Sequence, residues 1–382
     1  MKNNLGIYLH IPFCLRKCLY CDFCSKGNAS LEEMHAYTEA LLTEIRANAE
    51  RAEGYAVDTV FFGGGTPTLL PVSCFERILN EIRALYSLEE NAEITVEANP
   101  ATADKEKLIA LREMGVNRLS IGAQSLNDKE LSALGRVHSA ADAVHTVSLA
   151  REVGFTNINL DLMYGIPYQT EQSLSDTLDG ILALSPEHIS AYSLIVEEGT
   201  PFYEKKDTLP LPDEDTEVRL HELVSRRLRE NGYTHYEISN YAREGCSSRH
   251  NLHYWRYEPY LGFGAAAYSC FDGMRYGNTR DISAYVSSPL HAVSDKEILT
   301  ESDAAYEYIM LALRLSEGID LDVYKTRFGV TIEEKHADLI ERFGNMGWMK
   351  REGARLFLTE EGMRFSNTVL VAFMEEDSEE DS

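Results

Sequence analysis

Basic residues are scarce in this chain of 382 residues. It carries 36 Lys and Arg against 62 Asp and Glu, so its formal net charge is −26. Such a balance repels phosphate backbones and anionic lipid faces, which disfavours non-specific nucleic-acid or membrane binding outside a local basic patch. No apolar run reaches membrane-spanning length, and residues 1–6 lack the basic and apolar regions of a signal peptide. We therefore expect a cytoplasmic protein with no transmembrane segment and no nucleic-acid partner.

Internal repeats are also lacking, and low complexity is confined to the last eight residues. Six acids within 375–382 predict a solvated, disordered tail. With 44% apolar residues the chain is long enough to bury a sizeable core, and its length suggests two or three domains.

Short β-rich segments alternate with helical patterns over the first half of the chain. The predicted strands cover residues 5–11, 58–62, 94–98, 118–121, 157–162 and 188–194. Ser30 and Glu33 form a capping box for a helix that runs towards Arg51, and Asn127 with Glu130 predicts another helix start. Repeated βα units with right-handed crossovers make a parallel sheet, and six units predict an α/β fold of the partial (β/α)6 barrel type. An open doubly wound sheet is the alternative.

Polar and glycine-rich motifs follow the predicted strands and favour the barrel. They cover residues 14–21, 63–67, 97–100, 122–125 and 161–165. In a barrel the carboxyl ends of all strands share one face, where a site is built from many loops.

The pattern changes after residue 194. A Pro- and acid-rich stretch and a helix over 217–231 precede an aromatic, glycine-rich region, and a linker-like stretch precedes helices with a β-like segment over 348–358. The predicted division is a barrel over 1–230, an extension over 231–300, a winged-helix-like α+β module over 301–374 and the acidic tail over 375–382.

Cysteine is rare, and its placement gives no disulfide framework. Four of the seven cysteines, Cys14, Cys18, Cys21 and Cys24, fall within eleven residues, and the other three are scattered. Clustered thiols in a reducing compartment usually bind metal.

The first three of these cysteines have the spacing C-x3-C-x2-C, directly after a predicted strand. Three thiolates so spaced can hold three irons of a [4Fe–4S] cluster and leave the fourth iron open to a ligand. A structural zinc site or a four-thiolate electron-transfer cluster would need a fourth ligand and could recruit Cys24.

The residues around the cysteines resemble the radical S-adenosylmethionine (SAM) superfamily. The likeness rests on residues 8–14 and 20–23, in which Tyr20 places an aromatic ring before the third cysteine. The resemblance implies that Cys14, Cys18 and Cys21 hold the cluster and that SAM chelates the open iron. In that superfamily the reduced cluster breaks a C–S bond of SAM to release a 5′-deoxyadenosyl radical.

Further motifs resemble the coproporphyrinogen dehydrogenase-like branch of the superfamily, at residues 97–100, 134–136 and 159–167. Taken singly, an acid at a strand end or an arginine in a turn is more often a cap or an ion pair than a ligand. The joint resemblance implies that the glycine-rich motif binds the amino group of SAM, that Glu97 faces its ammonium and Arg136 its carboxylate, and that Gln124 and Asp161 face the ribose. The implied SAM residues are Tyr8, Tyr20, Phe23, Gly64, Gly65, Thr66, Glu97, Gln124, Arg136 and Asp161.

That branch contains an oxygen-independent coproporphyrinogen III oxidase and a haem chaperone, and the chain resembles the chaperones over nearly its whole length. The oxidase pattern has a fourth cysteine two positions after the third, where this chain has Phe23, and the oxidase has a longer N-terminal extension. Residues 249–255 match the H-N-x-x-Y-W motif associated with haem binding. The resemblance implies that His250 ligates haem, with His253 as a second candidate. Without it, a packed structural histidine is the ordinary interpretation.

The expected function is therefore haem binding and delivery to a haem-requiring acceptor protein such as a respiratory enzyme. The expected cofactors are a [4Fe–4S] cluster, SAM and haem. Oxidative decarboxylation of coproporphyrinogen III is the enzymatic alternative, and a structural metal protein completed by Cys24 is the third.

Overall fold

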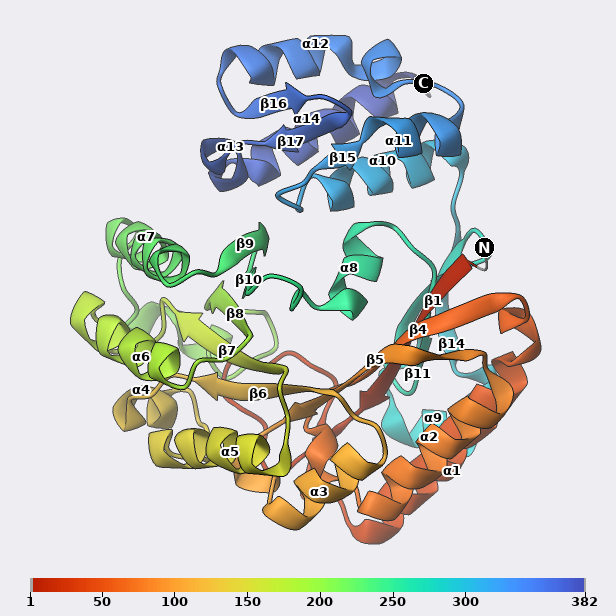
Figure 1. Cartoon of the computed structure of the whole chain (residues 1–382), viewed down its shortest axis with the longest axis vertical. Helices are drawn as coiled ribbons and strands as arrows, with labels where there is room; N and C mark the ends of the chain where they lie inside the picture. Colours follow the sequence, from red (N-terminus) through yellow and green to blue (C-terminus); the bar gives the residue numbers. More distant parts are fainter. Residues whose placement is uncertain (1–2, 381–382) are drawn as a thin grey trace.

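A curved sheet of twelve strands organises the molecule (Figure 1). The computed structural model describes residues 3–380, with side chains described over 3–374. Six parallel strands lie side by side in chain order at the centre of the sheet: β1 (Asn3–Ile11), β4 (Tyr55–Gly64), β5 (Leu88–Ala98), β6 (Arg118–Gln124), β7 (Ile158–Tyr164) and β8 (His188–Ser193). The predicted partial barrel is confirmed, and the doubly wound alternative is not, because the helices that connect these strands cover only the convex face.

The connecting helices begin where the sequence places their caps. They are α1 (Leu31–Asn48), α2 (Val72–Leu85), α3 (Lys105–Glu113), α4 (Asp128–Ala133), α5 (Ala140–Val153), α6 (Glu171–Ala183) and α7 (Glu214–Glu230). The capping box of Ser30 and Glu33 is present at α1. Asn127 caps α4 as predicted, but the Glu130 side chain takes no part in the cap. Its carboxylate accepts hydrogen bonds from the hydroxyls of Ser125 and Ser173, both at 2.6 Å.

Alternation along the central strands separates an apolar face from a polar one. Leu119 and Ile121 of β6 and Leu160 of β7 are fully buried against the outer helices. Their neighbours in sequence point the other way, because successive side chains of a strand face opposite sides. The hydrophobic core therefore lies between sheet and helices, and the inside of the barrel is left to polar side chains.

The extension after α7 adds strands to both edges of the sheet. Its elements are β9 (Thr234–Glu237), β10 (Asn240–Ala242), α8 (Arg249–Trp255), β11 (Tyr260–Phe263), β12 (Tyr268–Phe271), β13 (Met274–Asn278), α9 (Ile282–Ser287) and β14 (Val293–Ile298). Strand β10 pairs with β8, and β11 pairs with β1 at the other end of the six parallel strands. The chain between them, which includes α8, therefore crosses the open side of the partial barrel.

The C-terminal module has its own core and a sheet ordered β15-β17-β16. It comprises α10 (Glu301–Ala312), β15 (Ile319–Asp320), α11 (Leu321–Phe328), α12 (Ile332–Asn345), β16 (Met349–Glu352), β17 (Arg355–Leu358), α13 (Glu360–Arg364) and α14 (Ser366–Glu380). It meets the barrel at β9, where the amide of Ser316 donates to the carbonyl of Tyr236 at 2.9 Å and Leu315 bridges to Glu237.

Helix α14 includes most of the segment 375–382 for which the sequence predicts a disordered tail. That segment contains no glycine or proline to end the helix, so the backbone continues helically to Glu380. Its side chains and the last two residues lie outside the described part of the chain. None of the helices described in residues 3–380 combines the length and the apolar character needed to cross a bilayer.

Candidate cofactor site

A cavity of about 740 Å³ lies inside the barrel. It is lined by every residue expected to bind the cluster or SAM, and by His250, the first of the two haem candidates. These residues are Tyr8, Cys14, Cys18, Tyr20, Cys21, Phe23, Gly64, Gly65, Thr66, Glu97, Gln124, Arg136, Asp161 and His250. Cys24 and His253 lie outside its lining. We call this cavity the lumen.

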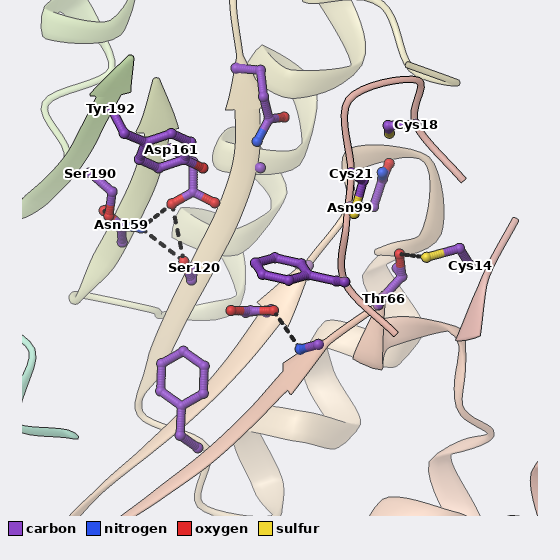
Figure 2. A pocket seen from close by; sticks show the side chains of 18 of the residues that line it. Cys14, Cys18, Cys21, Thr66, Asn99, Ser120, Asn159, Asp161, Ser190 and Tyr192 are labelled. Carbon is purple, nitrogen blue, oxygen red and sulfur yellow. Dashed lines mark hydrogen bonds between the residues drawn. The ribbon is translucent and has the colours of Figure 1, made fainter. Parts of the chain in front are cut away.

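The cysteine loop forms one side of the lumen (Figure 2). It starts at the short strand β2 (Phe13–Cys14), which pairs with β3 (Lys26–Gly27). The loop is held to the turn before α5, because the amide of Leu19 donates to the carbonyl of Leu134 at 3.1 Å and Arg16 Nη2 donates to the carbonyl of Gly135 at 3.0 Å. These contacts keep the three thiols at the carboxyl ends of the strands.

Two lumen residues donate hydrogen bonds to cluster cysteines. The Thr66 hydroxyl donates to Cys14 Sγ at 3.7 Å, and Arg136 Nη1 donates to Cys18 Sγ at 3.5 Å. Burial raises the pKa of Cys14, although the Thr66 bond opposes the shift, and burial raises the pKa of Cys21 to about 11. Both thiols are therefore protonated at neutral pH without metal, and iron would displace their protons.

The described residues include no three His, Cys, Asp or Glu side chains gathered about a point that would suit one metal ion. A cubane cluster binds each thiolate at a separate iron, so its ligands surround a larger volume. Cys24, the fourth ligand of the zinc alternative, donates its thiol hydrogen to the Arg280 carbonyl at 3.1 Å.

The glycine-rich motif packs against the cysteine loop. Gly64 has φ +110°, and a Cβ at this position would lie 2.5 Å from the His10 ring. A Cβ at Gly65 would lie 2.7 Å from the Phe13 carbonyl oxygen, because the Gly65 amide donates to Ile11 and the next amide to Phe13. The resemblance implies a ligand close to these glycines, whereas the structure shows a close approach of the chain to itself.

Three polar groups of the lumen match the groups that SAM presents. Gln124, in the left-handed region at φ +61°, holds its Oε1 buried without a partner among the described residues, as does the Nε of Arg136. Glu97 Oε2 accepts from the Gly64 amide at 3.1 Å, and burial together with the charge of Asp161 raises the pKa of Glu97 to about 8. An acceptor, a cationic donor and a buried carboxyl group suit the hydroxyls, the carboxylate and the ammonium of SAM. The strained backbone of Gln124 is typical of functional positions.

Several polar residues around Asp161 in the lumen were not identified from the sequence. Figure 2 shows Ser120, Asn159, Asp161 and Ser190 opposite the cysteines. Asn159 Nδ2 donates to Asp161 Oδ1 at 2.7 Å and to Ser120 Oγ at 2.8 Å, and Ser190 Oγ donates to Asn159 Oδ1 at 3.2 Å. Arg118 lines the same cavity. The sequence does contain a signal for these residues. Polar side chains stand at alternate positions of otherwise apolar strands, and this pattern indicates that one face of the sheet is polar.

His250 lies in the lumen wall, 1% exposed, with its ring stacked on Phe61 at 5.1 Å. Both ring nitrogens have partners: Nδ1 shares a hydrogen bond with Thr59 Oγ1 at 2.9 Å, and Nε2 with the Tyr254 hydroxyl at 2.8 Å. Burial lowers its pKa well below the usual value, so the ring is neutral. Ligation of iron by Nε2 therefore requires the Tyr254 hydroxyl to give up its bond.

His253 does not line the lumen. Its Nε2 lies 2.7 Å from Asp58 Oδ1, and both side chains are buried. This contact joins α8 to β4 and gives His253 a structural role.

Known proteins match both parts of the chain. Residues 8–181 match the family described as Radical SAM superfamily, and residues 299–365 match the HemN C-terminal domain. A protein of Bacillus subtilis (strain 168) named Heme chaperone HemW is 36% identical over 375 residues, covering 97% of this chain and 99% of that protein. Proteins of the same name from Lactococcus lactis and Escherichia coli (strain K12) are 33% and 34% identical, with at least 97% of this chain covered.

The fold also matches a solved structure, described as coproporphyrinogen III oxidase (HemN) from Escherichia coli, a radical SAM enzyme. The TM-score is 0.86 with 23% identity, over 97% of this chain and 90% of that one, which establishes the shared fold. A radical SAM domain takes a [4Fe–4S] cluster and SAM, so these two expected cofactors are confirmed at the level of the family. Since its relatives are matched from end to end at more than 30% identity, the chain belongs to the HemW family of the radical SAM superfamily.

Proposed function

We propose that this protein binds haem and transfers it to a haem-requiring acceptor protein, on a scaffold that holds a [4Fe–4S] cluster and SAM. The observation that carries the proposal is the end-to-end similarity to proteins named Heme chaperone HemW. The likeness to the oxidase is confined to the fold. The acceptor is a protein that needs haem, such as a respiratory enzyme, and the free thiols of all seven cysteines support a reducing, cytoplasmic setting.

In this proposal Cys14, Cys18 and Cys21 hold the cluster and leave one iron for SAM. When bound, the cluster supplies the electron that cleaves a C–S bond of SAM. Thr66 and Arg136 stabilise the thiolate forms of Cys14 and Cys18 by donating to their sulfurs.

The polar residues Glu97, Gln124, Arg136 and Asp161 position SAM. Glu97 accepts from its ammonium beside the Gly64 and Gly65 backbone, the free Nε of Arg136 meets its carboxylate, and Gln124 with Asp161 meets the ribose hydroxyls. The aromatic rings of Tyr8, Tyr20 and Phe23 enclose the remainder of the molecule, and Phe23 is 64% exposed at the rim.

Haem binding is assigned to the α8 segment with His250. The neutral imidazole can donate a nitrogen lone pair to haem iron once the Tyr254 hydroxyl moves, and the stacked ring of Phe61 lies beside it. His253 holds α8 to the barrel through Asp58 and has no role toward iron in this proposal.

A haem titration of the wild type, His250→Ala and His145→Ala tests the assignment. His145 is an exposed histidine of α5 and serves as the control. We expect weaker binding and an altered haem absorption spectrum only in His250→Ala. Equal affinity in all three proteins would remove His250 from the haem site.

A transfer assay tests the activity itself. Haem-loaded protein mixed with an apo-haem protein should convert that protein to its holo form. Incubation with coproporphyrinogen III, SAM and a reductant should leave the porphyrinogen unchanged, whereas sustained formation of protoporphyrinogen would establish the oxidase alternative.

A further inference from the structure

Arg118 is a buried lumen residue whose charge the proposed site leaves unused. It opens β6 and is only 2% exposed, although it lines the cavity. Its Nε is buried without a partner, and its guanidinium forms no hydrogen bond or salt bridge with any residue of the described chain. Buried arginines are normally paired, because an isolated cation in a poorly solvated site loses its hydration without compensation.

The nearby acids are engaged elsewhere. Glu97 Oε2 accepts from the Gly64 amide, and Asp161 Oδ1 accepts from Asn159. Burial raises the pKa of both carboxyl groups, and the charge of Arg118 opposes that rise, but neither group forms a salt bridge or hydrogen bond with Arg118 in the described chain. The guanidinium donors of Arg118 are therefore available to a ligand.

Arg118 lies at the opposite end of β6 from Gln124 and Arg136. Gln124 closes the strand that Arg118 opens, and six residues at about 3.3 Å each separate the two by roughly 20 Å. The cysteines and Arg136 lie at the Gln124 end, because Arg136 Nη2 donates to the Gly122 carbonyl at 2.8 Å. A ligand group at Arg118 is thus distinct from the carboxylate of SAM.

The surroundings of Arg118 combine the charge with aromatic walls. His250, Phe61 and Tyr8 form a stack, with ring centroids 5.1 Å apart for His250 and Phe61 and 6.1 Å apart for Tyr8 and Phe61. His250 and Arg118 line the same cavity, and burial together with the charges of His253 and Arg118 lowers the pKa of His250. One cation beside a stack of rings suits an amphipathic molecule with a flat apolar body and a carboxylate.

We propose that Arg118 binds a carboxylate at its end of the lumen and that this carboxylate is a propionate of haem. This inference rests on the proposed haem-chaperone function and adds the group that orients haem there. Haem carries two propionates, and a guanidinium can hold a carboxylate through two parallel hydrogen bonds.

The test compares Arg118→Met with Arg151→Met, a control on α5 whose arginine donates to Glu187 and to two backbone carbonyls. Haem and haem dimethyl ester, which lacks the free propionates, are titrated into each protein. We expect the wild type and the control to prefer haem by about tenfold, and Arg118→Met to bind both compounds alike. An undiminished preference in Arg118→Met would overturn the inference while haem binding itself still supports the proposed function.

A second measurement separates the two proposals. Without ligand, Arg118→Met should melt no lower than the wild type, whereas Arg151→Met should melt lower. Sodium propionate at millimolar concentration should raise the melting temperature of the wild type but not of Arg118→Met, relative to sodium chloride. If propionate acts in this way and haem does not bind, the site takes a small carboxylate and the chaperone proposal fails. If propionate stabilises both proteins equally, or if Arg118→Met is destabilised like the control, Arg118 is a structural cation and the inference fails.

Discussion

Arg136 Nη1 donates a hydrogen bond to the sulfur of Cys18 over 3.5 Å. The same guanidinium donates from Nη2 to the Gly122 carbonyl at 2.8 Å and keeps its Nε buried without a partner in the described chain. One side chain thus connects a cluster cysteine to the end of β6 and retains a donor for a ligand.

Replacement of Arg136 by Gln should therefore weaken SAM binding more than cluster binding. The three cysteines remain, so iron content after anaerobic reconstitution should be unchanged. SAM affinity should fall by about tenfold or more, because charge-assisted hydrogen bonds contribute about 1.5–3 kcal/mol. SAM titration followed by the spectrum of the reduced cluster measures the effect. Arg16→Gln, which removes donors only to backbone carbonyls, should retain SAM affinity, and an equal loss in both variants would contradict the role of Arg136.

Cys24→Ala should keep the cluster. Its thiol donates to the Arg280 carbonyl and lies outside the lumen lining, so the cluster does not depend on it. Anaerobic reconstitution should give about four irons and four sulfides per chain in both the wild type and Cys24→Ala. Cys21→Ala should lose the cluster. Loss of iron on substitution of Cys24 would instead support a four-thiolate site.

Gly64→Ala should disturb the cysteine loop beyond the cost of its backbone conformation. Gly64 and Gly54 both have positive φ, at +110° and +91°, but a Cβ at Gly54 meets nothing within 4 Å. Gly54→Ala should cost about 1 kcal/mol in the free energy of unfolding. Gly64→Ala should cost about 2 kcal/mol more, because the methyl group collides with His10. Denaturant unfolding of the two variants measures the difference, and equal costs would show that the His10 contact relaxes freely.

Glu44 should make stability fall as the pH rises. Burial raises its pKa to about 7, although three hydrogen bonds from Tyr285, Asn278 and the Gly264 amide oppose the shift. The folded state therefore binds this proton more tightly than the unfolded state. The contribution is fully present below the unfolded pKa near 4.5 and is lost as the pH rises through 7, over a range worth about 3 kcal/mol.

The unfolding free energy of Glu44→Gln should lack this slope between pH 5 and 8, whatever its absolute stability. Urea unfolding at several pH values measures it. Glu32→Gln changes an exposed residue of the same helix and should keep the wild-type slope. Parallel pH profiles for the wild type and Glu44→Gln would rule out Glu44 as the source.

The six central strands could be predicted because each carries a short apolar run between glycine or polar residues. Their ends were less accessible. The apolar run of β6 stops at Ile121, but the strand continues to Gln124 because its neighbours still pair with it. The extension looked like a separate unit, since nothing local reveals that β10 and β11 join opposite edges of one sheet.

In the candidate site, too, some residues could be identified from the sequence and others only from the fold. The cysteine and glycine motifs are local in sequence and were identifiable from spacing and resemblance. Arg118, Ser120 and Asn159 sit inside strands, where their meaning depends on which face points into the barrel. Likewise, the partners of His250 on β4 and α8 appear only when the chain is folded.

The contact between the C-terminal module and β9 has a consequence for the barrel. Strand β9 is the last in the sheet, and Leu315 and Ser316 occupy its free edge through the bridge to Glu237 and the bond to Tyr236. A barrel cut off before the module would bare those backbone groups, and unprotected strand edges recruit other strands. The module thus shields its own barrel from edge-to-edge aggregation, so the two parts are best kept together in any preparation.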